Sequence, residues 1–127
     1  MRLFFFIPII LLFSCDGKIK NSNPSIKIIK DSYDIGNVAP NTITKGYFVI
    51  QNIGNYPIKY CNLVVDCNCT NLDVNIGDSI NPNEIDTINF TLNTTNMISN
   101  SVVNKCIRIL TNSKPDLHRF YIVGKIR

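Results

Sequence analysis

The chain has few of the features on which enzymes depend. It contains a single histidine, His118, among its 127 residues, and no serine or cysteine nucleophile motif accompanies that histidine. It also has no glycine-rich phosphate loop. Because His118 precedes an apolar run, we expect it to be a surface or edge residue rather than a catalytic base.

Charge is sparse as well, at 17% of the residues, and the formal net charge is only +4. Nucleic-acid binding requires a concentrated basic stripe with aromatic platforms. The lysines and arginines of this chain are instead scattered along its length, which is typical of a solvated surface. We therefore expect no nucleic-acid partner.

One long apolar run begins the chain, and it is too short to cross a membrane. From Leu3 to Phe13 it would extend roughly 16 Å as a helix, against a hydrocarbon core of roughly 30 Å. A basic residue, this run, Ser14 and then Cys15 follow the order of a bacterial lipoprotein signal. We therefore predict a signal peptide at residues 1–14 and a diacylglyceryl thioether on Cys15. The alternative is an ordinary signal peptide in which Cys15 is an unmodified thiol.

Lipidation of Cys15 predicts a membrane-anchored lipoprotein of the bacterial cell envelope that faces the periplasm or the cell surface. At about 0.8 kcal/mol per buried methylene, two or three acyl chains anchor a protein stably. Residues 15–25 comprise the lipidated cysteine and a polar, turn-prone stretch, which predicts a flexible tether. Residues 26–127 suit one domain with one modest core.

That domain is predicted to be all-β. Helical periodicity is absent, and short β-branched and aromatic runs alternate with Asn, Gly, Pro and Asp, as in a β-sandwich. We expect an edge strand at 26–30 and further strands at 44–52, 58–65, 72–76, 86–93, 102–111 and 117–126. Alternation within the strands predicts the core, which consists of Phe48, Ile50, Ile58, Tyr60, Ile88, Phe90, Leu92, Ile107, Ile109, Phe120 and Ile122.

Several segments between residues 33 and 127 form a combined pattern: Tyr33-Asp34-Ile35-Gly36, Phe48-Val49-Ile50-Gln51-Asn52-Ile53-Gly54, Pro57-Ile58, Cys67-Asn68-Cys69-Thr70, Ile80-Asn81-Pro82-Asn83-Glu84 and Ile107-Arg108-Ile109-Leu110-Thr111-Asn112. This order resembles domain-of-unknown-function family 1573. Members usually have Cys-Gly-Cys-Thr, whereas Asn68 replaces that glycine here and Asn83 replaces a glycine after Pro82; asparagine tolerates the left-handed conformation. The resemblance implies a secreted or lipid-anchored bacterial protein with an immunoglobulin-like β-sandwich of about seven strands, and it implies no reaction.

Besides Cys15, the chain contains Cys61, Cys67, Cys69 and Cys106, an even number in an oxidising compartment. In an immunoglobulin-like topology the strands of Cys61 and Cys106 are antiparallel neighbours, and alternation places both thiols on the same outer face. One expectation is therefore a Cys61–Cys106 disulfide, which would stabilise the fold by on the order of 4 kcal/mol. The alternative is two separated free thiols.

The Cys67-Asn68-Cys69 segment allows three interpretations. The favoured one is a structural turn with buried or paired sulfurs. The second is a copper or zinc site, which would need further ligands, and the sequence places neither His118 nor Met97 nearby. The third is disulfide exchange through an easily reduced bond, although thioredoxin-like sites have two intervening residues and begin a helix.

Five acidic residues lie near predicted turns, where carboxylates often accept hydrogen bonds from backbone N–H groups; they are Asp66, Asp73, Asp78, Glu84 and Asp86. A paired acid and base for hydrolysis would need a cleft, which a small sandwich rarely provides. Asn68 and Asn93 each begin an N-glycosylation pattern, which we attribute to chance because organisms with such lipoprotein signals mostly lack that machinery.

Together these features predict a lipid-anchored, non-catalytic binding or structural module with no cofactor other than the lipid on Cys15. The expected partners are the membrane and an envelope protein of unspecified identity, with no small-molecule substrate. The edge strand at 26–30 could add to another chain's sheet. The alternative function is a thiol protein that binds copper or zinc, or exchanges disulfides, through Cys67 and Cys69.

Overall fold

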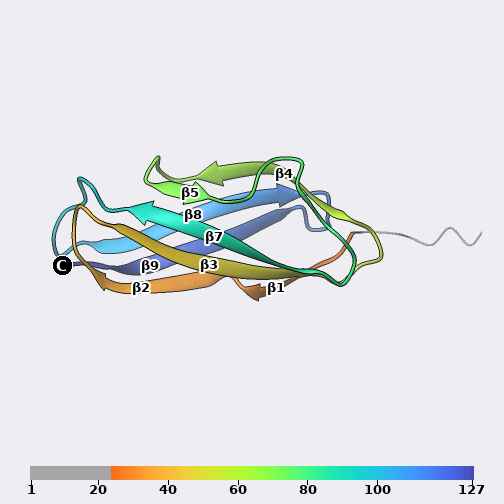
Figure 1. Cartoon of the computed structure of the whole chain (residues 1–127), viewed down its shortest axis with the longest axis horizontal. Coiled ribbons are helices and arrows are strands. Elements are labelled where there is room, and N and C mark those ends of the chain that lie inside the picture. The colour runs from red at the N-terminus through yellow and green to blue at the C-terminus, as the bar shows by residue number, and fades with distance from the viewer. Residues whose placement is uncertain (1–23) are drawn as a thin grey trace, which may run out of the picture.

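Two β-sheets packed face to face make up residues 24–127, the part of the chain that the computed structural model describes (Figure 1). The predicted signal peptide and most of the predicted tether lie outside these residues. One sheet has the strand order β1-β3-β7-β5 and the other β2-β9-β8-β4-β6. The strands are β1 Ile26–Lys30, β2 Ser32–Val38, β3 Ile43–Asn52, β4 Ile58–Val65, β5 Thr70–Leu72, β6 Ser79–Ile80, β7 Ile85–Asn93, β8 Val102–Thr111 and β9 Leu117–Ile126.

Most of the predicted strands are confirmed. β1, β4, β8 and β9 have the predicted bounds, and β3 and β7 begin one residue before them. The predicted strand at 72–76 is wrong, because β5 ends at Leu72 and the chain then turns. In that turn the Asp78 carboxylate accepts a hydrogen bond from the Asn75 N–H at 2.9 Å, and Gly77 adopts a positive φ of 94°. Such local bonds compete with strand pairing.

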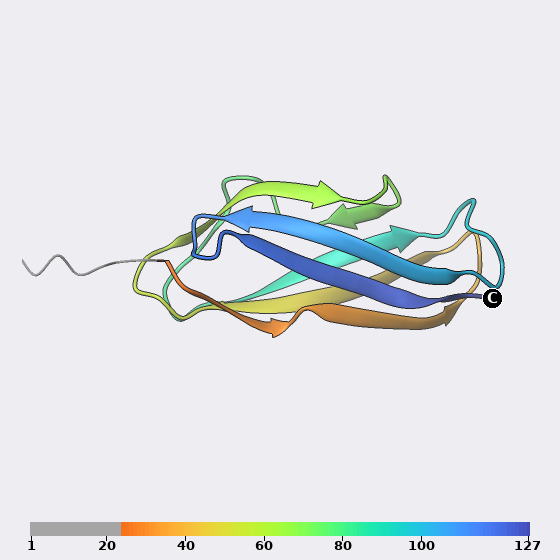
Figure 2. The same ribbon diagram turned by 180° about the vertical axis from the view of Figure 1, so that it is seen from behind.

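Of the nine strands in the described residues, the prediction misplaces β5 and lacks β2 and β6. β2 pairs in parallel with β9, with Ser32 opposite Tyr121 and Val38 opposite Ile126. Only Asp31 separates β1 from β2, so the chain passes there from one sheet to the other. Figure 2 shows both strands, in orange, one after the other along the same side of the sandwich. One continuous segment thereby provides an edge strand to each sheet.

The core lies between the two sheets, and its predicted membership is confirmed. All eleven predicted core residues are at most 2% exposed, and four further apolar side chains join them: Val74, Ile80, Val103 and Ile126. Phe48 lies at its centre, with its ring centroid 5.2 Å from that of Phe90 and 5.1 Å from that of Phe120. Each such large side chain contributes about 1.5–3 kcal/mol through burial. Alternation of apolar residues in each strand therefore produces the sandwich.

Candidate functional site

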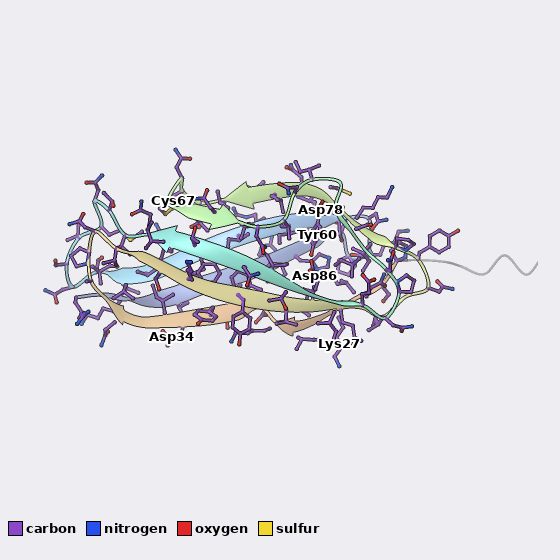
Figure 3. All side chains as sticks on the ribbon, in the orientation of Figure 1. Lys27, Asp34, Tyr60, Cys67, Asp78 and Asp86 are labelled. Carbon is purple, nitrogen blue, oxygen red and sulfur yellow. A yellow bond between two sulfur atoms is a disulfide. The ribbon has the colours of Figure 1, made fainter. Side chains whose placement is uncertain are left out.

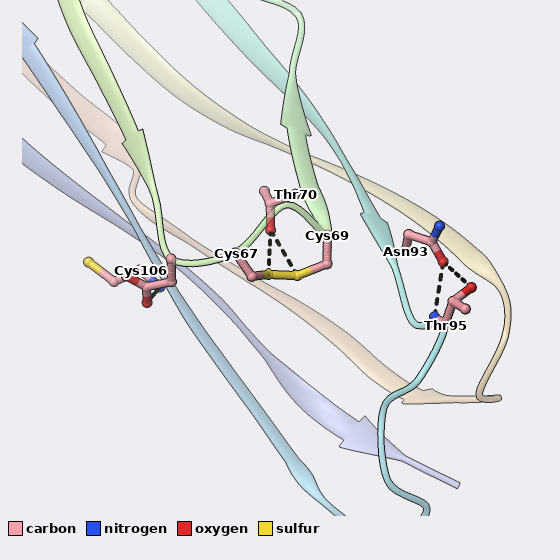
Figure 4. Close-up of a disulfide and its surroundings, with 7 residues drawn as sticks. Cys67, Cys69, Thr70, Asn93, Thr95 and Cys106 are labelled. Carbon is pink, nitrogen blue, oxygen red and sulfur yellow. Dashed lines mark hydrogen bonds between the residues drawn. A yellow bond between two sulfur atoms is a disulfide. The ribbon is translucent and has the colours of Figure 1, made fainter.

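The Cys67-Asn68-Cys69 segment forms the turn between β4 and β5, and its two sulfurs are joined in a disulfide (Figure 4). The Cα atoms of Cys67 and Cys69 are 5.2 Å apart. Thr70, the first residue of β5, is 4% exposed, and its hydroxyl oxygen lies 3.9 Å from the sulfur of Cys67 and 3.8 Å from that of Cys69. This arrangement agrees with the interpretation of a structural turn with paired sulfurs.

The backbone also holds this turn in place. The Thr70 N–H donates to the Cys67 carbonyl at 3.3 Å, and the Asn93 N–H donates to the Cys69 carbonyl at 2.8 Å. Both sulfurs are used in the disulfide, so neither is a thiolate ligand in this state. Within residues 24–127, no group of three or more His, Cys, Asp or Glu side chains could hold a metal ion.

The expected Cys61–Cys106 disulfide is wrong, because both cysteines are free. Strands β4 and β8 are antiparallel neighbours as predicted, but their register separates the thiols. Cys61 lies in an irregularity between Tyr60 and Asn62, whereas Val65 is opposite Ile107, so Cys106 lies opposite Asp66. Five residues of strand correspond to about 17 Å, which no disulfide can bridge.

His118 is not the surface or edge residue that we expected. It is 8% exposed, and β9 lies between β2 and β8. Its Nε2 is 3.2 Å from the Thr111 hydroxyl and 3.0 Å from the Ser113 hydroxyl. Burial lowers the pKa of the imidazole, against the opposing effect of Asp116. His118 is buried because the β8–β9 turn brings the hydroxyl groups of Thr111 and Ser113 against its ring.

Ser113 was not among the predicted site residues, although its hydroxyl lies beside the imidazole of His118. It is 2% exposed, and its hydroxyl donates to the Pro115 carbonyl at 3.0 Å. A nucleophile must reach its substrate, whereas this oxygen is enclosed and already bonded. The Thr111, Ser113 and His118 cluster is therefore suited to holding the β8–β9 turn together.

Four of the five predicted turn carboxylates accept hydrogen bonds from backbone N–H groups, as expected. The pairs are Asp66 with Cys106 at 2.9 Å, Asp73 with Asn89 at 2.9 Å, Asp78 with Asn75 at 2.9 Å, and Glu84 with Asn81 at 3.0 Å. The Cys106 N–H also holds the pKa of Asp66 below its usual range, and the Arg108 guanidinium, 3.3 Å away, acts in the same direction.

Asp86 is the exception, since it accepts a hydrogen bond from the hydroxyl group of Tyr60 (Figure 3). Tyr60 comes from β4 and Asp86 from β7, so this bond joins the two sheets. The Tyr60 side chain is 1% exposed. Burial raises the pKa of Tyr60, and the hydrogen bond to Asp86 raises it further. The pair is therefore a structural crosslink through polar groups.

A groove crosses β3, β7 and β5, and two of its polar side chains, Asp73 and Asn89, are paired with each other. It is lined by Lys45, Gly46, Asn71, Leu72, Asp73, Asn89, Phe90 and Thr91. The Asp73 carboxylate accepts hydrogen bonds from both the backbone N–H and the side-chain amide of Asn89, at 2.9 and 2.8 Å. A ligand that bound through Asp73 or Asn89 would have to compete with these bonds. Residues 24–127 also form no helix that is long and apolar enough to cross a membrane.

Comparison with known proteins identifies a family and a fold. The family model described as "Protein of unknown function (DUF1573)" matches residues 26–126. No curated protein sequence matches the chain.

Solved structures with the same fold share little sequence identity with this chain. A protein of unknown function from Porphyromonas gingivalis W83 has a TM-score of 0.66 at 13% identity; the match covers 82% of this chain and 47% of that one, so this chain spans about half its length. The ASH/PapD-like domain of human CEP192 has a TM-score of 0.66 at 11% identity, with 100% and 96% of the two chains covered. A family 123 glycoside hydrolase from Clostridium perfringens has a TM-score of 0.62 at 8% identity, with 76% and 22% covered. These similarities confirm the predicted all-β, immunoglobulin-like class of fold.

Proposed function

The chain belongs to the DUF1573 family of proteins of unknown function, and we propose that it is a non-catalytic binding or structural module held on the bacterial cell envelope by lipid on Cys15. The observation that supports the non-catalytic role is how its ionisable side chains are used. Asp66, Asp73, Asp78 and Glu84 bond to backbone N–H groups, and Asp86 bonds to Tyr60. The imidazole of His118 is enclosed by hydroxyl groups. Groups of the types that enzymes use for acid and base catalysis therefore stabilise the sandwich here.

The position of the N-terminal end supports anchoring through Cys15. Ser25 lies immediately before β1, at one end of the sandwich. Its carbonyl accepts hydrogen bonds from the Ile53 and Gly54 N–H groups. A lipid attached ten residues earlier would therefore leave both outer sheet faces available to an envelope protein.

The test of this proposal is metabolic labelling with palmitate in a bacterial host, with Cys15→Ala as the control. The wild-type chain should incorporate label and partition into the detergent phase of a cloud-point extraction. The alanine variant should incorporate none and remain in the aqueous phase. An unlabelled wild-type chain, or equal partitioning of both forms, would refute lipid anchoring.

The second candidate function is disulfide exchange, which the geometry of the β4–β5 turn favours. Attack by a substrate thiolate on Cys67 or Cys69 would form a mixed disulfide and release the other sulfur as a thiolate. A second substrate thiol would then displace the protein, so that the substrate is oxidised and the Cys67–Cys69 pair is reduced. The Thr70 hydroxyl, 3.9 and 3.8 Å from the two sulfurs, could donate a hydrogen bond to the released thiolate.

This candidate is tested by incubating the protein with a reduced dithiol peptide and measuring peptide oxidation. Thr70→Val, which keeps the shape of the side chain and removes the hydroxyl, should slow the exchange. Cys67→Ser combined with Cys69→Ser should abolish it. Peptide oxidation that persists in the double serine variant would come from an oxidant other than the Cys67–Cys69 disulfide, because Cys61 and Cys106 are free thiols, and it would refute this candidate.

A further inference from the structure

The β3–β4 turn lies at the point where the N-terminal segment joins the sandwich. The Ser25 carbonyl accepts hydrogen bonds from the Ile53 N–H at 3.0 Å and from the Gly54 N–H at 3.2 Å. The start of β1 and this turn are at the same end of the molecule (Figure 1). Any anchor on the N-terminal side therefore pulls on this end.

Apolar side chains are exposed at this end. Ile53 is 54% exposed and Tyr56 is 51% exposed, and both belong to the β3–β4 turn. Ile85, the first residue of β7, is 60% exposed. The Asn52 N–H donates to the Glu84 carbonyl at 3.0 Å, which places Ile85 beside the turn. We call these three side chains the apolar tip.

The turn is held in shape without the help of the exposed side chains. The side-chain amide of Asn52, which is fully buried, donates to the Tyr56 carbonyl at 2.7 Å and to the Ile80 carbonyl at 2.9 Å. The Gly54 N–H donates to the side-chain oxygen of Asn52 at 3.0 Å. The side chains of Ile53 and Tyr56 are therefore presented on a fixed backbone and are free to contact another surface.

The anchor limits how far this tip can be from a membrane. Ser25 is ten positions after Cys15 in the sequence, and a fully extended chain of that length spans at most roughly 35 Å. Confinement within such a distance gives the apolar tip a high effective concentration at the membrane surface. Tyrosine is enriched at membrane interfaces, where its ring lies at the level of the headgroups, and burial of isoleucine there is favourable.

We propose that the apolar tip inserts into the interface of the membrane that holds the lipid on Cys15. The inference rests on the proposed lipid anchoring and extends it, because it assigns an orientation to the sandwich. The β3–β4 turn faces the lipid, and the opposite end, with the β7–β8 connection and the C-terminus, points away. The flanking charges are of both signs, as with Lys59 and Glu84, so the contact depends on apolar burial and does not require anionic lipid.

The chain contains no tryptophan, so a single introduced tryptophan reports on one position. Tyr56→Trp places the reporter in the tip. Val102→Trp is the control, because Val102 is 78% exposed and begins β8 at the opposite end of the sandwich. Both full-length lipidated variants are reconstituted into neutral phosphatidylcholine vesicles, with and without bromine on the acyl chains.

The emission of Tyr56→Trp should shift to shorter wavelength on reconstitution and fall roughly twofold with brominated lipid, as expected for an indole at the interface. Val102→Trp should show neither change. Addition of Ile53→Asp to Tyr56→Trp should reduce the quenching while the circular dichroism spectrum stays unchanged.

Three results would overturn the proposal. If Tyr56→Trp floats with the vesicles and is not quenched, the tip does not insert although the anchor holds. If both reporters are quenched equally, the sandwich has no preferred orientation. If neither variant floats with the vesicles, the anchoring through Cys15 fails, and the insertion of the tip fails with it.

Discussion

Gly46 is the position where a single added methyl group should be most informative about the core. It lies in β3 between the two sheets, opposite Phe90 on β7. A Cβ atom at residue 46 would be 2.6 Å from Cε1 of Phe90 and 2.7 Å from Cδ1 of Tyr33, and closer still to Cζ of Phe90. These separations are far below van der Waals contact, so the rings would have to move.

The rings have little room to do so. Phe90 is 2% exposed, and its centroid lies 5.2 Å from that of Phe48 and 5.5 Å from that of Tyr33. Overpacking of a dense core typically costs 1–3 kcal/mol. We therefore expect Gly46→Ala to lower the free energy of unfolding by about 2 kcal/mol and the melting temperature by roughly 8–16 °C, at about 4–8 °C per kcal/mol for a domain of this size.

A double-mutant cycle with Phe90→Leu tests the cause. Leucine lacks the ring atoms that the new methyl group meets, so Gly46→Ala should cost about 1 kcal/mol less in the leucine background than in the wild type. The assay is urea unfolding of a soluble form that begins at residue 16, followed by circular dichroism. A loss below about 0.5 kcal/mol for Gly46→Ala, or additive effects of the two changes within that margin, would refute the steric argument.

Three further predictions concern ionisable and sulfur groups. Burial raises the pKa of Tyr60, so above pH ~10 only the unfolded state loses this proton and stability should fall by up to about 1.4 kcal/mol per pH unit; alkaline urea titrations of Tyr60→Phe should lack this fall. Burial lowers the pKa of His118, so below pH ~6.5 the unfolded state binds the extra proton and stability should decline as the pH falls. The stability of His118→Gln should lack this decline between pH 7.5 and 5.5. Equal slopes of stability against pH for the variant and the wild type would contradict the assignment. Alkylation of the denatured, unreduced soluble form should modify two thiols, Cys61 and Cys106, and mass spectrometry should find four modified thiols after reduction. Four modified thiols before reduction would contradict the Cys67–Cys69 bond.

Strand positions could largely be predicted from local pattern. Alternation of large apolar side chains with polar ones gave the bounds of β4, β8 and β9, because their inward residues, such as Ile58, Ile107 and Phe120, are fully or almost fully buried. β2 could not be found in this way. None of its residues is fully buried, and it is a strand only because it pairs with β9, far along the chain.

The candidate site was less predictable than the fold. The acidic residues at turns accept backbone hydrogen bonds as expected, but the donor is local, three residues away, only for Asp78 and Glu84. Asp66 and Asp73 accept from Cys106 and Asn89, 40 and 16 residues away along the chain, and only the tertiary structure brings those donors near. The environment of His118 was not predictable, because the hydroxyl groups of Thr111 and Ser113 reach its ring only when the β8–β9 turn closes. The bond from Tyr60 to Asp86 likewise requires that the two sheets face each other.

The amino-acid order by itself determined most of the extended segments and most of the inward-facing side chains, because these follow from the two-residue period of a strand and from the turn conformations of Gly, Pro and Asn. Only the tertiary structure decided which strands are neighbours and in what register. The register of β4 against β8 separates Cys61 from Cys106, and the bonds from Ile53 and Gly54 to Ser25 place an exposed apolar turn beside the N-terminal segment. Such pairings depend on contacts between residues distant in the chain, and no local pattern contains them.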